Sequence, residues 1–149
     1  MHSLRLHHIG YAVDHIEPNA QAYITRFGYE PITPILHDPI QTAYVQFLKL
    51  PHDQTYLEFV APDSPTSKLT AVTAKTGGGL NHLCYIAGPL EETIDHLESA
   101  GLRLISDPKP AVALGNRRIC WLLGPHRVPI ELVERRHDQD LCQPGLALA

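Results

Sequence analysis

An internal repeat constrains this chain more than any other feature of its sequence. The segment His8-Ile9-Gly10-Tyr11-Ala12-Val13 matches His82-Leu83-Cys84-Tyr85-Ile86-Ala87 position by position, at an offset of 74 residues. An accidental match would drift out of register within a few residues, so the distances to later landmarks test whether the repeat is real.

The later landmarks keep the register in both copies. A glycine follows the first histidine after 20 residues and the second after 19, and a glutamate follows each glycine after 30 residues. These residues are His8, Gly28 and Glu58 in the first copy and His82, Gly101 and Glu131 in the second. The chain therefore reads as one module written twice, in which a histidine strand opens each copy and a glutamate strand closes it.

Hydrophobic periodicity predicts the same element order, strand, helix and three strands, in both copies. We expect an α+β fold in which two tandem βαβββ modules form an eight-stranded, cup-shaped mixed sheet with outer helices. The expected single domain spans 1–149, with module 1 at about 6–61, a linker at 62–79, module 2 at about 80–134 and a tail at 135–149. In the linker, Ser64 suits the N-cap and Pro65 the first turn of a helix that runs to about Lys75. A proline-rich loop is expected at 107–116.

Composition narrows the class of protein. With 44% apolar residues among 149, the chain can bury a sizeable core. A net charge of −4 without a basic cluster gives no reason to expect nucleic acid or an anionic membrane as partner. No apolar run approaches the roughly 18 residues of a membrane span, and three cysteines without a C-x-x-C pair suit a reducing compartment. We expect a cytoplasmic protein.

Two histidines and two glutamates stand at equivalent places in the two modules. Because side chains alternate between the faces of a strand, a lone His or Glu in a strand with an apolar, helix-facing side points to the other face. A buried carboxylate there needs a cation as partner. Ten histidines make any one of them uninformative, and either glutamate alone suits a half-exposed strand. The four together, His8, Glu58, His82 and Glu131, predict a site for one divalent ion such as Zn, Co, Ni, Mn or Fe.

These motifs resemble those of the vicinal oxygen chelate superfamily (glyoxalases, bleomycin resistance proteins and dioxygenases), and they are most similar to methylmalonyl-CoA epimerases. The resemblance covers about residues 6–134. It rests on the opening His8–Val13, the linker Asp63-Ser64-Pro65, the run Gly77–His82, then Gly115-Asn116-Arg117 and the closing Ile130-Glu131-Leu132.

The resemblance implies a metal-dependent isomerase or epimerase that removes a proton alpha to a carbonyl. His8, Glu58, His82 and Glu131 match the family's ligand positions, and Glu131 is the candidate for ligand and base together. A small-molecule substrate such as an acyl-CoA and a homodimer are also implied. The candidate substrate-binding residues are Tyr44, Gln46, Asn116 and Arg117.

One position departs from the epimerase pattern. Epimerases supply a second carboxylate from a middle strand of the first module, where this chain has Val45 with Gln46 beside it. Neither side chain can act as a base, which leaves Glu58 or a group from the His37-Asp38 loop as replacements. A glyoxalase I-like lyase, an Fe(II) dioxygenase and a non-catalytic binding or resistance protein of the same fold remain alternatives.

Overall fold

The computed structural model describes residues 3–136, and their secondary structure is α+β, as predicted. Among these residues there are nine strands and three helices, one strand more than expected. The strands are β1 Ser3–Ala12, β2 Glu30–Pro31, β3 Leu36–Asp38, β4 Ala43–Lys49, β5 Tyr56–Pro62, β6 Gly79–Gly88, β7 Arg103–Pro110, β8 Arg118–Leu123 and β9 Pro129–Glu134. The helices are α1 Ile16–Phe27, α2 Thr70–Thr76 and α3 Leu90–Ser99.

The chain divides into two units, each of which is described by itself. The central unit is Ile9–Asn81, and the C-terminal unit combines the residues up to His8 with those from His82 onward. Both divisions fall inside a strand, the first in β1 and the second in β6. The first six described residues of β1 therefore belong with the second copy of the repeat.

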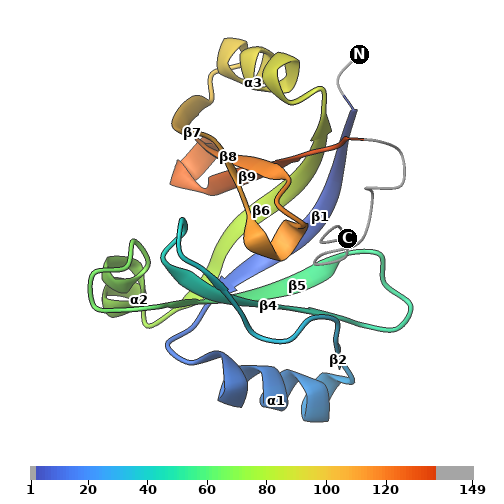
Figure 1. Cartoon of the computed structure of the whole chain (residues 1–149), viewed down its shortest axis with the longest axis vertical. Coiled ribbons are helices and arrows are strands. Elements are labelled where there is room, and N and C mark those ends of the chain that lie inside the picture. Colours follow the sequence, from blue (N-terminus) through green and yellow to red (C-terminus); the bar gives the residue numbers. More distant parts are fainter. Residues whose placement is uncertain (1–2, 137–149) are drawn as a thin grey trace. The chain divides into compact units, whose positions relative to one another are not determined.

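In the central unit, a β4–β5 hairpin packs against α1 (Figure 1). The two short strands β2 and β3 both pair with β4 in antiparallel fashion, where the sequence predicted one strand at 29–36. Leu48, Leu57 and Phe59 meet Ile16 and Ala20 of α1 in a buried core. The helix ends where predicted, because Gly28 adopts a left-handed conformation (φ 80°) and its N–H bonds back to the last turn.

In the C-terminal unit, β6 pairs with β9 in parallel, and β9, β8 and β7 follow as antiparallel neighbours. Helix α3 covers one face (Figure 1). That face is apolar: its buried members Ala87, Cys120, Leu122 and Leu132 pack against Leu90 and Ile94 of α3. The side chains of opposite parity on β6, β8 and β9 therefore point away from α3, and they include His82, Trp121 and Glu131.

The predicted start of the linker helix is wrong. Helix α2 begins only at Thr70, after Leu69, and no side chain caps it. Ser64 instead forms a turn, in which its carbonyl accepts bonds from the N–H of Ser67 and the hydroxyl of Thr70. These competing local bonds satisfy the groups that a helix would have used. The helix ends at Gly77, as predicted.

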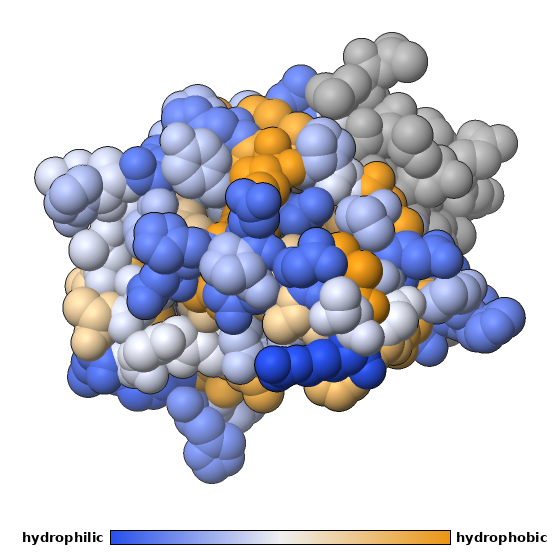
Figure 2. Space-filling model, turned by 90° about the horizontal axis from the view of Figure 1, so that it is seen from below, coloured by the Kyte–Doolittle hydropathy of each residue, from blue (hydrophilic) through white to orange (hydrophobic). Residues whose placement is uncertain are grey.

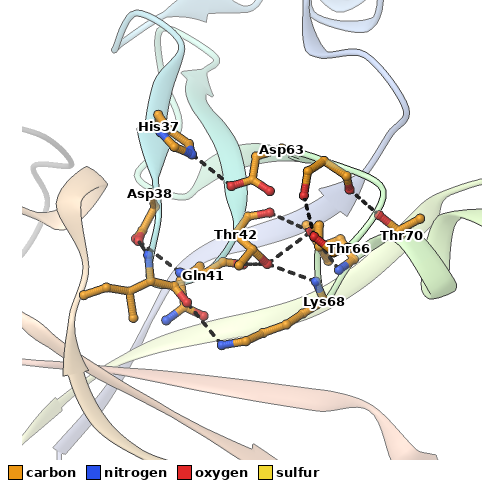
Figure 3. A network of polar contacts seen from close by, with 12 residues as sticks. His37, Asp38, Gln41, Thr42, Asp63, Thr66, Lys68 and Thr70 are labelled. Atoms are coloured by element: carbon orange, nitrogen blue, oxygen red, sulfur yellow. Dashed lines mark hydrogen bonds and ion pairs between the residues drawn. The ribbon is translucent and has the colours of Figure 1, made fainter.

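A polar network holds this turn against the loop between β3 and β4 (Figure 3). Ser67 Oγ donates to the carbonyl of Thr42 at 2.6 Å, and Thr42 Oγ1 accepts from the N–H of Lys68. At the edge of the network His37 Nε2 lies 2.9 Å from Asp63 Oδ2. Asp38 is buried and its Oδ1 accepts the N–H groups of the next turn, so this carboxylate has a structural role.

The prediction of a loop at 107–116 is also wrong for residues 107–110. Strand β7 continues to Pro110, and Lys109 and Pro110 still pair with Ile119 and Arg118 of β8. The ladder has two register shifts, and the second, between Ser106 and Lys109, spans Pro108, which donates no backbone hydrogen bond. The remaining residues form a short 3₁₀ turn at Val112–Leu114.

The glycine run after α2 has a steric reason. Gly78 adopts φ +97°, and a Cβ on it would lie 2.5 Å from the carbonyl oxygen of Ala12. A larger residue would push β1 away from the start of β6, since this neighbour is backbone and not a flexible side chain.

The surface mixes polar and apolar groups. On the face shown in Figure 2, hydrophilic side chains are interspersed with hydrophobic ones. None of the helices in the described part of the chain is long and apolar enough to cross a membrane.

Candidate metal centre

The candidate centre lies in the C-terminal unit, on the sheet face that points away from α3. Glu131 of β9 stands beside Cys84 of the parallel neighbour β6, and His82 lies two residues before Cys84 on the same face. His8 closes the part of β1 that belongs to this unit. His8, His82 and Glu131 are 0%, 4% and 4% exposed, so all three functional groups are withdrawn from bulk water.

The three side chains converge through one atom each. His8 Nε2 lies 3.1 Å from His82 Nε2 and 3.1 Å from Glu131 Oε1, and His82 Nε2 lies 3.7 Å from the same oxygen. Three of the four predicted ligands are thus brought together.

The arrangement fits a divalent cation. A triangle with these sides has its corners about 1.9 Å from one point, so a position just outside its plane is about 2.1 Å from all three atoms, as in zinc sites. Oε1 of Glu131 is buried and accepts no hydrogen bond within the described residues, because the approach of His8 lacks hydrogen-bond geometry. Two imidazoles and a carboxylate suit Zn²⁺, Co²⁺, Ni²⁺, Mn²⁺ or Fe²⁺.

Two neighbours shape the site from the same sheet face. Trp121 lies opposite Glu131 in the ladder, and its ring stands edge-on to His82 at 4.8 Å between centroids. Cys84 is fully buried, and burial raises the pKa of its thiol.

A neighbour of this cluster that the sequence reasoning missed is His7. It is 1% exposed, and its Nδ1 lies 2.7 Å from Nδ1 of His8, on the ring edge opposite the converging Nε2. The available signal was the His7-His8 pair itself, although adjacent strand residues ordinarily point to opposite faces.

Glu58, the fourth predicted ligand, lies in the central unit. It is 6% exposed in β5, where its ladder partner is Phe47 of β4. By parity it points away from the α1 core that Leu57 and Phe59 join, as the alternation rule predicted. Its role as a ligand stays a prediction. Val45 shares this face with it and is buried.

The four predicted substrate-binding residues are not gathered in one unit. Tyr44 and Gln46 lie on the face of β4 opposite to Glu58, where Gln46 donates to the carbonyl of Thr33. In the C-terminal unit, Asn116 is exposed with φ 59°, and Arg117 is 1% exposed with its Nε donating to the carbonyl of Leu114. Their contact with a substrate stays a prediction.

Comparison with known proteins shows the family of this chain. A family model described as the glyoxalase/bleomycin resistance protein/dioxygenase superfamily matches residues 7–121. The chain belongs to this superfamily, and the predicted family and fold class are confirmed.

Within the superfamily, the chain is similar to acyl-CoA epimerases. It is 28% identical to the ethylmalonyl-CoA/methylmalonyl-CoA epimerase of Cereibacter sphaeroides over 119 residues, which are 79% of this chain and 87% of the relative. The structure of methylmalonyl-CoA epimerase from Mycobacterium tuberculosis matches with a TM-score of 0.78 and 26% identity, covering 97% of this chain and 91% of that chain. A variant of the Streptomyces coelicolor methylmalonyl-CoA epimerase in complex with 2-nitronate-propionyl-CoA matches with a TM-score of 0.77 and 25% identity, covering 95% and 100%.

Proposed function

We propose that this chain is a divalent-metal-dependent isomerase that removes the proton alpha to the thioester carbonyl of an acyl-CoA of the methylmalonyl or ethylmalonyl type. The observation that carries the proposal is the convergence of His8 Nε2, His82 Nε2 and the unsatisfied Oε1 of Glu131. The similarity to epimerases of these substrates supports the choice of acyl group.

The three residues of the cluster would have two roles, metal binding and abstraction of the alpha proton. His8, His82 and Glu131 would hold a divalent cation, which would supply Lewis-acid stabilisation of the negative charge that develops on the carbonyl oxygen. The Glu131 carboxylate accepts the carbon-bound proton, since it is the acidic member of the cluster and lies beside the place where the charge develops. Burial of all three groups strengthens these electrostatic effects by excluding water.

A nitronate is a planar anion with the charge distribution of an enolate. Its presence as the ligand of a related epimerase suits a reaction that passes through such an anion. The substrate of this chain is proposed to pass through the same planar state.

Inversion of the carbon centre requires proton delivery to the second face of the enolate. Val45 cannot act as a base, and Asp38 is committed to its own turn. His37 Nε2 bonds to Asp63, which leaves Glu58 as our candidate for the second proton-transfer group. Glu58 is buried on the same face of the β4–β5 hairpin as Val45.

A second candidate follows from Val45 itself. Removal and return of a proton on one face needs only one base, as in a glyoxalase I-like lyase or a one-base isomerase. Such a reaction would use Glu131 alone, with the same cation and the same ligands. A homodimer, as is common in the superfamily, stays part of the prediction.

The test is solvent deuterium incorporation into methylmalonyl-CoA and ethylmalonyl-CoA, followed by mass spectrometry. Metal-stripped protein is assayed alone and with Co²⁺, Ni²⁺, Mn²⁺ or Zn²⁺. We expect metal-dependent exchange at the alpha carbon, with epimerisation of the optically pure substrate. Exchange without epimerisation would select the one-base reaction. No exchange with any metal would overturn the proposal and turn attention to an Fe(II) dioxygenase or a small-molecule binding protein.

A further inference from the structure

The hydrogen bond between His7 and His8 has no part in the proton transfer described above. Nδ1 of His7 and Nδ1 of His8 are 2.7 Å apart and both rings are buried. The rings stand nearly perpendicular, with an interplanar angle of 80°. Two nitrogens at this distance share one proton, so one ring donates and the other accepts.

The direction of this hydrogen bond decides whether Nε2 of His8 has a free lone pair with which to bind a cation. A neutral imidazole carries one proton, so a proton on Nδ1 leaves the Nε2 lone pair free to bind a metal. A proton on Nε2 would occupy the atom that faces His82 and Glu131. Metal binding therefore requires His8 to be the donor in the His7–His8 bond.

We propose that His7 is a positioning residue that accepts the Nδ1–H of His8, which fixes the tautomer and the ring orientation that present Nε2 to the metal. The inference rests on the proposed metal-dependent function. Metal-bound histidines generally donate their second ring N–H to a carboxylate, a carbonyl or a water, and here a second imidazole takes that place. Because the accepting ring is neutral, it orients His8 without adding a negative charge to the site.

The same atoms also allow a second metal site, since His7, His8 and the Cys84 sulfur form another close group. A separation of 2.7 Å between the two Nδ1 atoms is the length of a hydrogen bond and is short for two ligands of one ion. The hydrogen-bonding role therefore accounts better for the geometry.

The first experiment uses a matched pair of variants, His7→Asn and His7→Leu. Asn and Leu have nearly the same shape, but only Asn keeps an acceptor oxygen close to the position of the His7 Nδ1. The dissociation constants of Co²⁺ and Zn²⁺ are measured by competition with a chromogenic chelator. We expect His7→Leu to weaken binding by about 10- to 100-fold, the usual effect of losing an outer hydrogen bond, and His7→Asn to stay within about 3-fold of the native protein.

The outcomes separate this inference from the proposed function. If the native protein binds neither ion, the metal-dependent function is overturned and the inference fails with it. If the native protein binds and His7→Leu binds equally tightly, only the positioning role is overturned. A thiolate-to-cobalt charge-transfer band that disappears in Cys84→Ser would also overturn it, because His7 would then belong to a second metal site.

A second measurement needs no substitution and therefore does not depend on how the variants fold. In the Zn²⁺-loaded, ¹⁵N-labelled protein, a scalar coupling across the N–H···N bond connects the two Nδ1 atoms. We expect the proton to reside on His8 Nδ1, with coupling to His7 Nδ1. A proton on His7 Nδ1, or no coupling between these nitrogens, would overturn the proposal.

Discussion

The two buried glutamates of the repeat have different surroundings within their own units. Glu131 of β9 stands opposite an aromatic residue, Trp121, and two imidazole nitrogens lie within 3.7 Å of its Oε1. Glu58 of β5 also stands opposite an aromatic residue, Phe47, and it is 6% exposed in the central unit. The ladder position is thus repeated in both copies, and Glu131 has two histidine partners within its own unit.

The two units do not coincide with the two copies of the repeat. The first part of β1, which ends at His8, belongs to the C-terminal unit together with His82. Both histidines therefore join the glutamate of the second copy. Within its own unit Glu131 thus has two imidazole partners, and the role of Glu58 must be tested by substitution.

The largest expected effect comes from Glu131→Gln. The amide keeps the shape of the side chain but cannot accept a proton, so we expect alpha-proton exchange to fall by about 10³- to 10⁴-fold. The matched variant Glu58→Gln should retain more exchange and lose mainly epimerisation. Deuterium incorporation and chiral analysis of the product measure both effects. Equal losses of exchange in the two variants would contradict the assignment of Glu131 as the base that starts the reaction.

The next largest expected effect is a loss of stability on truncating a residue in the hydrophobic core of either unit. Phe59 is completely buried against α1, and Leu122 is completely buried against α3. We expect Phe59→Ala to cost about 3–5 kcal/mol and Leu122→Ala about 2–5 kcal/mol of unfolding free energy, through lost burial and the cavities left behind. Denaturant titrations followed by circular dichroism measure both values.

These core variants also test how far the two units unfold together. Trp121, the single tryptophan, reports on the C-terminal unit. Because β1 and β6 each run through both units, we expect Phe59→Ala to shift the fluorescence transition of Trp121 as much as the transition in circular dichroism. An unchanged Trp121 transition would show that the C-terminal unit folds independently.

The sequence predicted the features that depend on spacing and alternation. The α+β class, the positions of α1 and α3, and the sheet faces of Glu58, His82 and Glu131 followed from glycine stops and from the period of two. The helix start at Ser64 was missed because local side-chain and turn bonds outweighed a good capping pattern. The contribution of His7 was missed because it depends on how two adjacent imidazoles turn toward each other, which no sequence period encodes.

Substitution of a ligand should reduce metal affinity without a comparable loss of stability. We expect His82→Gln to weaken Co²⁺ binding by more than about 100-fold, since even an outer hydrogen bond is worth 10- to 100-fold. His96→Gln, on the exposed surface of α3, is the matched control and should bind as the native protein does. Titration of the apo proteins with Co²⁺, followed by visible absorption, gives the affinities. Equal binding by both variants would remove His82 from the site.

The smallest expected effect is on the stability of the central unit, through a polar network that contains none of the proposed metal ligands. A hydrogen bond from His37 Nε2 holds the pKa of Asp63 below its ordinary value. Because the folded pKa is lowered, the carboxylate contributes stability above its unfolded pKa of about 3.9, and this contribution is lost as the pH falls through the folded value. Asp63→Asn should therefore lower the urea midpoint slightly at pH 7, and the difference from the native protein should vanish in acid. The exposed Asp95→Asn serves as a control for the removal of one surface carboxylate. A difference in urea midpoint between Asp63→Asn and the native protein that persists below the folded pKa would contradict this account. The side chain would then act through its shape or its neutral hydrogen bonds, and its charge would not contribute to the stability of the central unit.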